Sequence, residues 1–495
     1  MASQHLTKSR YIAGLQCLRR LWLLVNESKP YEEPALGSPM DVGQEIGLKA
    51  HLLFPGGVLV DEEPWRHAQA VVRTTDLMMD ERVLAIFEGA FEFDGIRIRV
   101  DVLERLAGGG WGLREVKSST GPKDYYFDDL ALQVYVLKGL SVALSSIELI
   151  YVNTAYVRGS GDVSWVDFFA RVDVNDAVAA RLADLPTRLP SMRDCLGSVE
   201  VPDAEPGSQC STPHECEFWD RCTADKPADW IAYLPRVSSA SRAQLNALGI
   251  EAISSIPPDF ALTWKQAIIR DAIVSGRPYV AADLPRSLRS FGPPACYLDF
   301  EAMMPPIPLY EGTRPYQTLP FQWSLHTLDR DGTLLHQEFL AHGASDPRRQ
   351  FAETLIAALA SSTTPIIVYS AYERTQLKKL GANFPDLSAP LNALIERLAD
   401  LLPLVRTAVY FPEFEFSNSI KSVAPALCPS FSYDDLDGVA DGIAAAGAFL
   451  QLASGAVSVS NEVAALRTQL LAYCERDTLA MVEVHRALIR LTPNG

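Results

Sequence analysis

The sequence lacks a long apolar run. A helix that crosses a bilayer needs about 18–20 consecutive apolar residues, but the Ala-rich stretch from Ile443 to Ala453 is short and interrupted by glycine. The amino-terminal segment MASQHLTKSRYIAGLQCLRR has no uninterrupted apolar core and no small-residue cleavage site, which argues against a secretory signal. We therefore expect a cytoplasmic protein with no membrane partner.

Basic residues are scarce relative to acidic ones. The 495 residues include 44 Lys and Arg against 61 Asp and Glu, a formal net charge of −17. A protein that coats nucleic acid non-specifically needs a basic footprint for the phosphates, so this charge argues against a coating protein. It does not exclude a metal-dependent enzyme, because carboxylates that hold divalent cations add negative charge and the cation reverses the local sign.

Cysteine is also sparse, with eight residues in the chain. In the cytoplasm these are expected to be reduced thiols, metal ligands or core residues rather than a disulfide framework. Hydrophobic residues make up 48% and charged residues 21%, a balance typical of a globular protein. The length is sufficient for two or three domains with ordinary cores.

The hydrophobic pattern divides the chain into three regions. Residues 1–228 begin with an amphipathic helical pattern and continue into strands, whereas residues 229–290 read as short helices separated by prolines. Residues 291–495 start a new pattern in which strands and helices alternate. We predict an α/β protein with two domains joined by a helical connector.

Strand signals are clearest at four places. Alternation runs from Phe91 to Val102, and a second strand, Trp111–Lys117, follows the glycine turn at residues 108–110. In the last region the strand ACYLDFEA is followed by a buried strand at residues 365–369, and a long helix spans about residues 462–491. The first two strands are predicted to be adjacent.

Charged residues share one face of the two amino-terminal strands. Side chains alternate across a strand, so Asp101 points to the polar face of its strand, and Glu115 and Lys117 share one face of the next. If the strands pair, two carboxylates can bind a divalent cation and the lysine can orient water or stabilise charge on a phosphate. His51, on an earlier helical segment, is a candidate ligand, and Gln133 follows downstream.

This order of residues resembles the RecB-like nucleases of the PD-(D/E)xK superfamily, especially the iron–sulfur branch that includes AddB and the CRISPR-associated RecB-type exonucleases. The family has a restriction-endonuclease-like fold. The resemblance implies metal binding by His51, Asp101 and Glu115, and catalytic roles for Lys117 and for Gln133, which belongs to the helix after the core strands. Many members have a tyrosine four residues after that glutamine, whereas Tyr135 stands two residues after it.

Four cysteines extend the resemblance. Cys210, Cys216 and Cys222 are evenly spaced in a short segment, and Cys17 lies in the amino-terminal helix. Similar nucleases hold a [4Fe–4S] cluster with one early and three late cysteines, so the resemblance implies these four as ligands. A structural Zn²⁺ site is the alternative, because zinc also accepts four cysteines. Spacing alone does not decide between the two.

A second set of acids lies in the carboxy-terminal region. Asp299 and Glu301 share one face of the strand ACYLDFEA, and Tyr473 and Asp477 share one face of the last helix. Two neighbouring acids repel each other unless a positive charge lies between them, which favours a metal site.

These motifs resemble the DEDD exonucleases of the RNase H-like fold, in the subgroup that carries a tyrosine. The family implies two divalent cations, Mg²⁺ or Mn²⁺, about 4 Å apart, that support removal of nucleotides from 3′ ends. Metal binding is then expected from Asp299, Glu301, Glu373 and Asp477, with Tyr473 positioning water. Between the first strand and the last helix, these exonucleases usually have a motif with an Asn and an Asp. Ser370 and Glu373 stand at those positions here, and Asp400 is a competing candidate for the acid.

The whole chain resembles a group of bacterial proteins in which a RecB-like nuclease is fused to an RNase H-like domain. The segments PYQTLPFQWSLH and SNSIKSVAPAL carry this resemblance besides the acids. We expect a metal-dependent nuclease with two sites that acts on DNA ends or single strands. The alternatives are an RNA-trimming exonuclease whose RecB-like half only binds substrate, and a non-catalytic nucleic-acid-binding adaptor.

Overall fold

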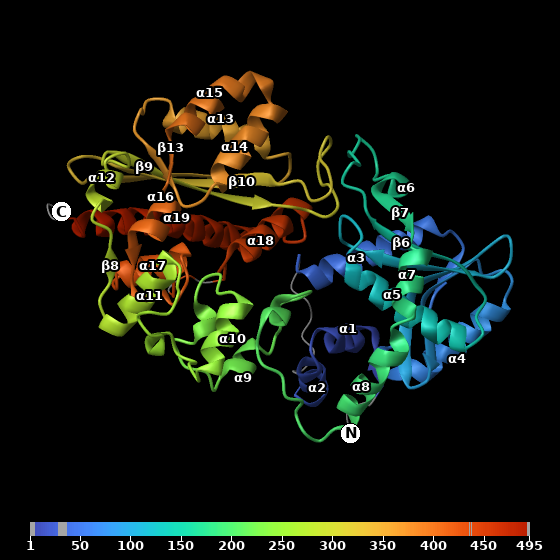
Figure 1. Cartoon of the computed structure of the whole chain (residues 1–495). Coiled ribbons are helices and arrows are strands. Elements are labelled where there is room, and N and C mark those ends of the chain that lie inside the picture. The colour runs from blue at the N-terminus through green and yellow to red at the C-terminus, as the bar shows by residue number, and fades with distance from the viewer. Residues whose placement is uncertain (1–4, 28–36, 435, 437, 493–495) are drawn as a thin grey trace. The chain divides into compact units, whose positions relative to one another are not determined.

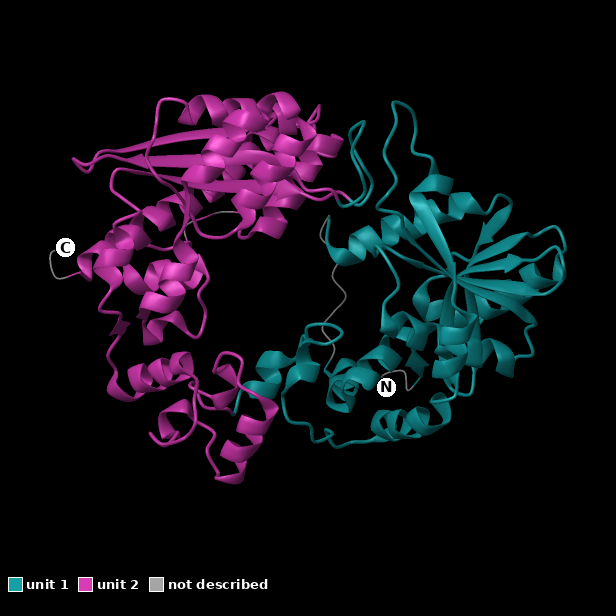
Figure 2. Cartoon of the chain, turned by 45° about the horizontal axis from the view of Figure 1, so that its top comes forward, with its two compact units in different colours: residues 1–225, 306–316 teal, residues 226–305, 317–495 magenta. Residues whose placement is uncertain are grey.

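The chain forms two compact units in the computed structural model (Figure 1, Figure 2), which describes residues 5–27, 37–434, 436 and 438–492. Unit 1 comprises Met1–Asp225 and Pro306–Tyr316, and unit 2 comprises Lys226–Pro305 and Gln317–Gly495. Within the described part of the chain, every helix is too short or too polar to cross a membrane.

Unit 1 is a mixed α/β unit. Its strands are β1 (Leu6–Thr7), β2 (Gly57–Leu59), β3 (Ala85–Phe93), β4 (Ile96–Arg105), β5 (Trp111–Lys117), β6 (Leu144–Val152) and β7 (Phe169–Asp173). Its α-helices are α1 (Lys8–Gln16), α2 (Leu18–Asn26), α3 (Pro39–Ala50), α4 (His67–Met79), α5 (Asp124–Gly139), α6 (Trp165–Phe168), α7 (Asn175–Leu182), α8 (Leu185–Gly197) and α9 (Trp219–Thr223). Short 3₁₀ turns are η1 (His51–Leu53), η2 (Pro64–Arg66) and η3 (Ser208–Ser211).

The sheet of unit 1 runs in the order β2-β3-β4-β5-β6-β7, with β1 beside the start of β4. The pairs β3–β4, β4–β5 and β6–β7 are antiparallel, whereas β5 and β6 are parallel and are connected through α5. The predicted adjacency of the strands on either side of the glycine turn is therefore confirmed. Helix α5 is buried on nearly all sides, and its apolar residues join the main core.

The alternation predicted as one strand from Phe91 to Val102 is two strands. A turn at Asp94 and Gly95, both with positive φ (53° and 74°), separates β3 from β4. The Asp-Gly dipeptide is a typical two-residue hairpin turn, because both positions adopt φ > 0 at low cost. Within β4 the predicted alternation is confirmed, since Ile96, Ile98 and Val100 are buried on one face.

Residues 306–316 belong with unit 1 although they lie between two strands of unit 2 in the sequence. The backbone N–H of Arg158 donates to Thr313 O at 3.0 Å, and its guanidinium donates to Pro308 O at 2.6 Å. The hydroxyl of Tyr316 donates to the carbonyl of Ser118, directly after β5. Unit 1 is thus completed by a segment from the carboxy-terminal half of the chain.

Unit 2 is also a mixed α/β unit. Its strands are β8 (Tyr279–Val280), β9 (Ala295–Met303), β10 (Leu319–Leu328), β11 (Leu334–Leu340), β12 (Ile366–Val368), β13 (Leu398–Asp400) and β14 (Val409–Tyr410). Its α-helices are α10 (Ser239–Ala247), α11 (Trp264–Ser275), α12 (Leu284–Leu288), α13 (Arg348–Leu359), α14 (Tyr372–Asn383), α15 (Ser388–Arg397), α16 (Leu401–Ala408), α17 (Ile420–Leu427), α18 (Gly442–Ser454) and α19 (Ser460–Arg490). The 3₁₀ turns are η4 (Ile231–Tyr233), η5 (Ile253–Ser255), η6 (Pro385–Leu387) and η7 (Pro412–Phe414).

The main sheet of unit 2 runs in the order β11-β10-β9-β12-β13. β9, β10 and β11 pair antiparallel, and β12 and β13 continue the sheet parallel to β9. Helices α13, α14 and α15 lie over one face and α19 lies over the other (Figure 1). Leu298 and Phe300 pack into the core beneath α13–α15, so the alternate residues Asp299 and Glu301 face α19.

The predicted connector, residues 229–290, lies within unit 2. It consists of short helices, as expected, but it also contains β8, which pairs antiparallel with β14. Lys265 on α11 donates to the carbonyl of Arg406 at the end of α16. These contacts attach the segment to the helices that follow β13.

Candidate active sites

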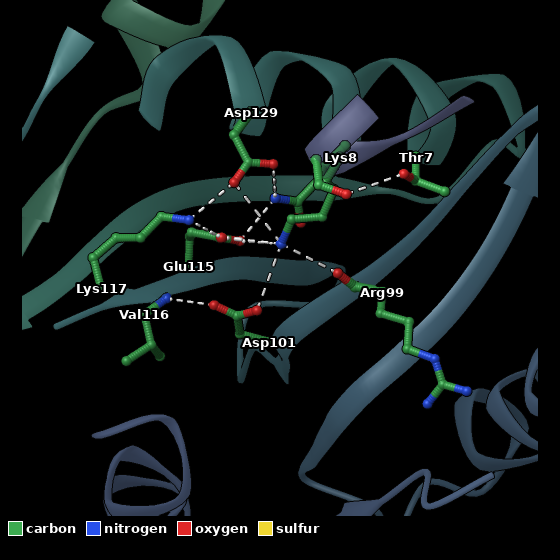
Figure 3. Close-up of polar contacts among 10 residues, drawn as sticks. Thr7, Lys8, Arg99, Asp101, Glu115, Val116, Lys117 and Asp129 are labelled. Carbon is green, nitrogen blue, oxygen red and sulfur yellow. Dashed lines mark hydrogen bonds and ion pairs between the residues drawn. The ribbon is translucent and has the colours of Figure 1, made fainter. Parts of the chain in front are cut away.

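Three carboxylates of unit 1 converge beside its central strands (Figure 3). Asp101 lies on β4 and Glu115 on β5, and Asp129 lies on the first half of α5. Because β4 and β5 pair antiparallel, the first two carboxylates lie on the same face of the sheet. The backbone N–H of Val116 donates to Asp101 Oδ2 at 2.8 Å, which orients that carboxylate.

Two lysine ammonium groups lie between these carboxylates (Figure 3). Lys117 Nζ is 2.6 Å from Glu115 Oε1 and 2.9 Å from Asp129 Oδ2. Lys8 Nζ, from the first residue of α1, is 3.0 and 3.1 Å from the two carboxylate oxygens of Glu115 and 3.5 Å from Asp101 Oδ1. Lys8 therefore contacts carboxylate oxygens of Asp101 and Glu115 that would otherwise be available as ligands for a divalent cation.

The lysines change the protonation of the acids. Burial would raise the pKa of Glu115, but the charges of Lys117 and Lys8 outweigh it and hold that pKa well below its usual value. Burial, together with the charge of Glu115, raises the pKa of Asp101 to about 6. Burial and the charge of Glu115 likewise raise the pKa of Asp129. The acids are thus unequal, with Glu115 the one most firmly ionised.

His51 and Gln133 lie beside the same acids. His51 caps the end of α3, stacks on the ring of Phe87 at a centroid distance of 3.9 Å, and lines a cavity of about 540 Å³ together with Asp101 and Glu115. Burial lowers the pKa of His51, which favours the neutral imidazole that can bind a metal. Gln133 Nε2 donates to Glu115 Oε2 at 2.7 Å.

Three residues of this site did not emerge from the sequence motifs: Lys8, Glu88 and Asp129. Asp129 lies one helical turn before Gln133, so the i,i+4 rule indicates that it shares the face of that glutamine. Glu88 lies in an irregular part of β3 with φ of 55° and lines the same cavity. Burial and the charge of Asp101 raise its pKa to about 7. No local sequence signal identifies Lys8 or Glu88.

The four predicted cysteine ligands line one cavity in unit 1. Cys17 lies between α1 and α2, whereas Cys210, Cys216 and Cys222 lie in and around η3 and α9. The backbone N–H of Cys216 donates to the carbonyl of Cys210 at 2.7 Å, which closes the loop that carries them. Residues almost two hundred positions apart in the sequence are thus brought together. Arg19 lines the same cavity.

A second acidic cluster lies between β9 and α19 in unit 2. Asp299 and Glu301 from β9 and Cys474 from α19 each offer a ligand atom, and these atoms all lie within 4.8 Å of one another. Asp299, Glu373 and Asp477 line a common cavity of about 360 Å³. The structure therefore brings together the four acids predicted from the sequence, and adds a buried thiol beside them.

The pKa values of these four acids are all raised, and the charges of neighbouring acids add to burial at Asp299 and Glu301. Burial, followed by the charges of Asp477 and Glu301, raises the pKa of Asp299 well above its usual value. Burial, followed by the charges of Asp477 and Glu373, raises the pKa of Glu301 to about 8, and burial raises that of Glu373 to about 7. Lys421 lowers the pKa of Glu301 and Asp477, but it does not outweigh burial. A cluster in this state favours bound cations.

The cavity is bordered by the loops at the ends of β12 and before α17. Tyr369 OH donates to Asn418 O at 3.1 Å, and Ser370 Oγ donates to Glu373 Oε2 at 3.2 Å. Ser419 caps the amino terminus of α17 by accepting from the N–H of Lys421. The segment SNSIKSVAPAL thus forms one wall of the cavity.

Two tyrosines interact with Asp477. Tyr433 OH, which the motifs did not indicate, donates to Asp477 Oδ1 at 2.9 Å. Tyr473 is buried one turn before Asp477 on α19, and hydrogen bonding to Tyr433 and Tyr473 opposes the effect of burial on the pKa of Asp477. The ammonium of Lys421 lies 5.1 Å from the ring centroid of Tyr473. Asp477 therefore has two phenol neighbours.

Asp400, the alternative to Glu373 as a metal-binding acid, caps a helix instead. It lies at the end of β13 and caps α16, where its Oδ1 accepts from the N–H of Leu402 at 3.0 Å. It does not border the cavity that Asp299 and Glu373 line. This geometry favours Glu373 as the fourth acid of the cluster.

One part of the chain matches a protein-family model. Residues 296–419 match the family model described as "Domain of unknown function (DUF2779)". This segment contains Asp299, Glu301 and Glu373 and ends before α19. No curated protein matches the chain. A solved structure titled "Crystal structure of SSO0001" is 17% identical over 35% of this chain and 85% of its own, with a TM-score of 0.14, which supports no conclusion about the fold.

Proposed function

We propose that this chain is a metal-dependent nuclease that hydrolyses phosphodiester bonds of DNA. Unit 1 carries a RecB-like site of the PD-(D/E)xK type, and unit 2 carries a 3′–5′ exonuclease site of the DEDD type on an RNase H-like fold. The observation that carries the proposal is the cluster of four buried acids with raised pKa values in unit 2. Buried acids without enough compensating charge are typical of functional sites rather than of structural ones.

The acid cluster of unit 2 has the chemistry of a magnesium or manganese site. Carboxylate oxygens are the ligands that these cations prefer, and Asp299, Glu373 and Asp477 border an open cavity of about 360 Å³. When bound, the cations would activate water and stabilise charge on the phosphate and leaving oxygen. The phenol of Tyr473, beside Asp477, then holds the attacking water in position, and Lys421 attracts the phosphate backbone.

The site of unit 1 fits the same chemistry with one difference. Asp101, Glu115 and His51 border a common cavity and offer oxygen and imidazole ligands, while Lys117 is placed to stabilise developing negative charge. Gln133 orients Glu115 through its amide. Lys8 contacts the two acids that would bind a cation, so the cation must displace its ammonium group.

We further propose that the four cysteines of unit 1 hold a [4Fe–4S] cluster. Cys17, Cys210, Cys216 and Cys222 line one cavity, and four thiolates are the ligands that such a cluster needs. A structural Zn²⁺ ion, which also accepts four cysteines, is the alternative. Such a group would fasten the segment around Cys216 to the amino-terminal helices.

Metal analysis tests the cluster. After anaerobic purification, the wild-type protein is expected to contain iron and inorganic sulfide, and Cys216→Ser is expected to lose both. Cys296→Ser is the matched control, because Cys296 lies in unit 2. Its sulfur is 3.5–3.8 Å from three hydroxyl groups, with which a serine hydroxyl can also form hydrogen bonds. Zinc without iron or sulfide would contradict the proposal.

A nuclease assay tests the central claim. End-labelled single-stranded DNA and RNA are incubated with Mg²⁺ or Mn²⁺ and with wild type, Asp299→Ala, Glu115→Ala or the double variant. Each single variant is expected to lose one pattern of products, and the double variant all cleavage. Glu396→Ala and Glu81→Ala, which remove exposed acids, control for non-specific effects. If wild type degrades neither substrate with either metal, the proposal fails.

The position of Lys8 favours a second candidate, in which unit 1 binds nucleic acid without cutting it. Lys8 and Lys117 together neutralise much of the charge of the unit 1 acids. In that case Glu115→Ala leaves all products unchanged, whereas Asp299→Ala abolishes them. Preference for RNA in the same assay would indicate an RNA-trimming enzyme.

A further inference from the structure

Two histidines and a glutamate form a cluster of their own in unit 2. His326 on β10 and His336 on β11 are directly opposite each other in the antiparallel pair, with ring centroids 4.5 Å apart. Glu475 reaches them from α19, and its Oε1 lies 3.6 Å from His336 Nδ1. One ligand atom from each of the three residues lies within 4.8 Å of the others. Three potential metal ligands from three elements are therefore within reach of one ion.

Hydroxyl groups hold both imidazole rings in place. His326 Nδ1 is 2.8 Å from Thr478 Oγ1, and His336 Nε2 is 2.9 Å from Ser324 Oγ. The two hydroxyls are themselves 2.8 Å apart. Each ring thus uses one nitrogen for a hydrogen bond and keeps the other for a ligand. Metal-binding histidines are commonly oriented in this way, by a partner on the nitrogen that does not bind the metal.

We propose that His326, His336 and Glu475 bind one Zn²⁺ ion. Two imidazoles and one carboxylate are a ligand set that zinc accepts, and three protein ligands leave a fourth position for water. The acid cluster around Asp299 offers mainly carboxylate oxygens, which suit Mg²⁺ or Mn²⁺ instead. The two sites therefore differ in the metal that they prefer, and the zinc site does not depend on the proposed nuclease activity.

The ion would connect α19 to the outer strands of the sheet. Glu475 lies between Tyr473 and Asp477 on α19, and Thr478 follows directly. Glu475 is half exposed, with 47% of its side chain accessible, and its contact with His336 draws it to the sheet. A bound zinc would fix this part of α19 against β10 and β11. It would thereby hold the register of the helix that carries Asp477 of the acid cluster.

Cobalt spectroscopy tests the site, because Co²⁺ replaces Zn²⁺ and absorbs visible light. Metal-free full-length protein is titrated with Co²⁺ in excess Mg²⁺, which occupies the acid clusters. Wild type is expected to bind one equivalent with nitrogen and oxygen ligation, and Glu475→Gln and His336→Ala are expected to lose it. Any cobalt at the cysteines is recognised by thiolate charge-transfer bands, which these variants leave unchanged. His342→Ala, which removes an exposed histidine, is the matched control.

Two further variants separate the site from its neighbours. Thr478→Val removes the hydroxyl beside His326 and is expected to weaken Co²⁺ and Zn²⁺ binding about 10–100-fold, the usual effect of losing such a partner. Asp299→Asn is expected to leave the spectrum unchanged. The proposal is overturned if Glu475→Gln binds cobalt like wild type, or if Asp299→Asn abolishes the same signal. Glu475 is on the surface of α19, so its substitution does not disturb the core.

Discussion

Replacing Glu301 with glutamine should remove a pH-dependent loss of stability in unit 2. The carboxyl group of Glu301 has a pKa of about 8 in the folded chain, because it is buried beside Asp477, against 4.5 for an unperturbed glutamate. Below the lower value the group is protonated in both the folded and the unfolded chain. Between the two values the unfolded chain releases the proton and the folded chain retains it. Folding therefore becomes less favourable as pH rises through this window.

The size of the effect follows from proton linkage. One proton retained by the folded chain lowers the free energy of unfolding by about 1.4 kcal/mol per pH unit. Between about pH 5 and pH 7 Glu301 alone then contributes a loss of roughly 3 kcal/mol. Glutamine is neutral throughout and has nearly the same shape, so Glu301→Gln should lack this contribution. Above about pH 8 the difference between the proteins should become constant.

The assay is denaturant unfolding in a chelator at several pH values. Hydrogen exchange of peptides from β9 and β10 reports the stability of unit 2 alone. Glu396→Gln, an exposed acid on α15, is the control and should follow wild type. Added Mg²⁺ should flatten the wild-type curve, because the cation stabilises the ionised carboxylates. If wild type and Glu301→Gln lose stability in parallel as pH rises, Glu301 does not share a buried charge cluster, and the reasoning is refuted.

Three other substitutions test separate parts of the structure. Lys8→Met removes the ammonium that contacts Glu115. It should tighten Mn²⁺ binding to unit 1, measured by calorimetry, about tenfold, which is equivalent to about 1.4 kcal/mol. The exposed control Lys138→Met should leave the affinity unchanged, and equal affinities of wild type and Lys8→Met would show that Lys8 does not compete with the cation. Tyr433→Phe removes the hydrogen bond to Asp477 and should weaken Mn²⁺ binding to unit 2 about 10–100-fold; an unchanged titration would contradict that role. Phe351→Ala leaves a cavity at a fully buried position between α13 and the sheet. It should lower the free energy of unfolding, measured with denaturant, by about 3–5 kcal/mol. A decrease below about 1 kcal/mol would argue against this packing.

Local periodicity accounts for the residues that could be predicted. Asp299 and Glu301 are two apart on a strand, and Tyr473 and Asp477 are four apart on a helix, so each pair shares a face wherever the element lies. The glycine turn similarly indicated the pairing of β4 and β5. The Asp94–Gly95 turn was missed although its dipeptide signal is strong, because alternation continues on both sides of it.

Residues that approach a site from a distant element left no such signal. Lys8 reaches Glu115 across 107 positions of sequence, and Tyr433 reaches Asp477 across 44. Cys17 and the three late cysteines were linked only by resemblance to known nucleases. Contacts of this kind depend on how elements pack, which the spacing of residues along one element does not specify.

The sequence by itself determined which residues share a face of one strand or helix, since that depends on backbone geometry alone. It therefore indicated the acids Asp101 and Glu115 of unit 1 and the acids Asp299, Glu301 and Asp477 of unit 2. Only the tertiary structure decided the charge around them. Lys8 and Lys117 compensate the first set, whereas the second remains a cluster of repelling carboxylates, because burial and the approach of other elements decide which charges are left without partners.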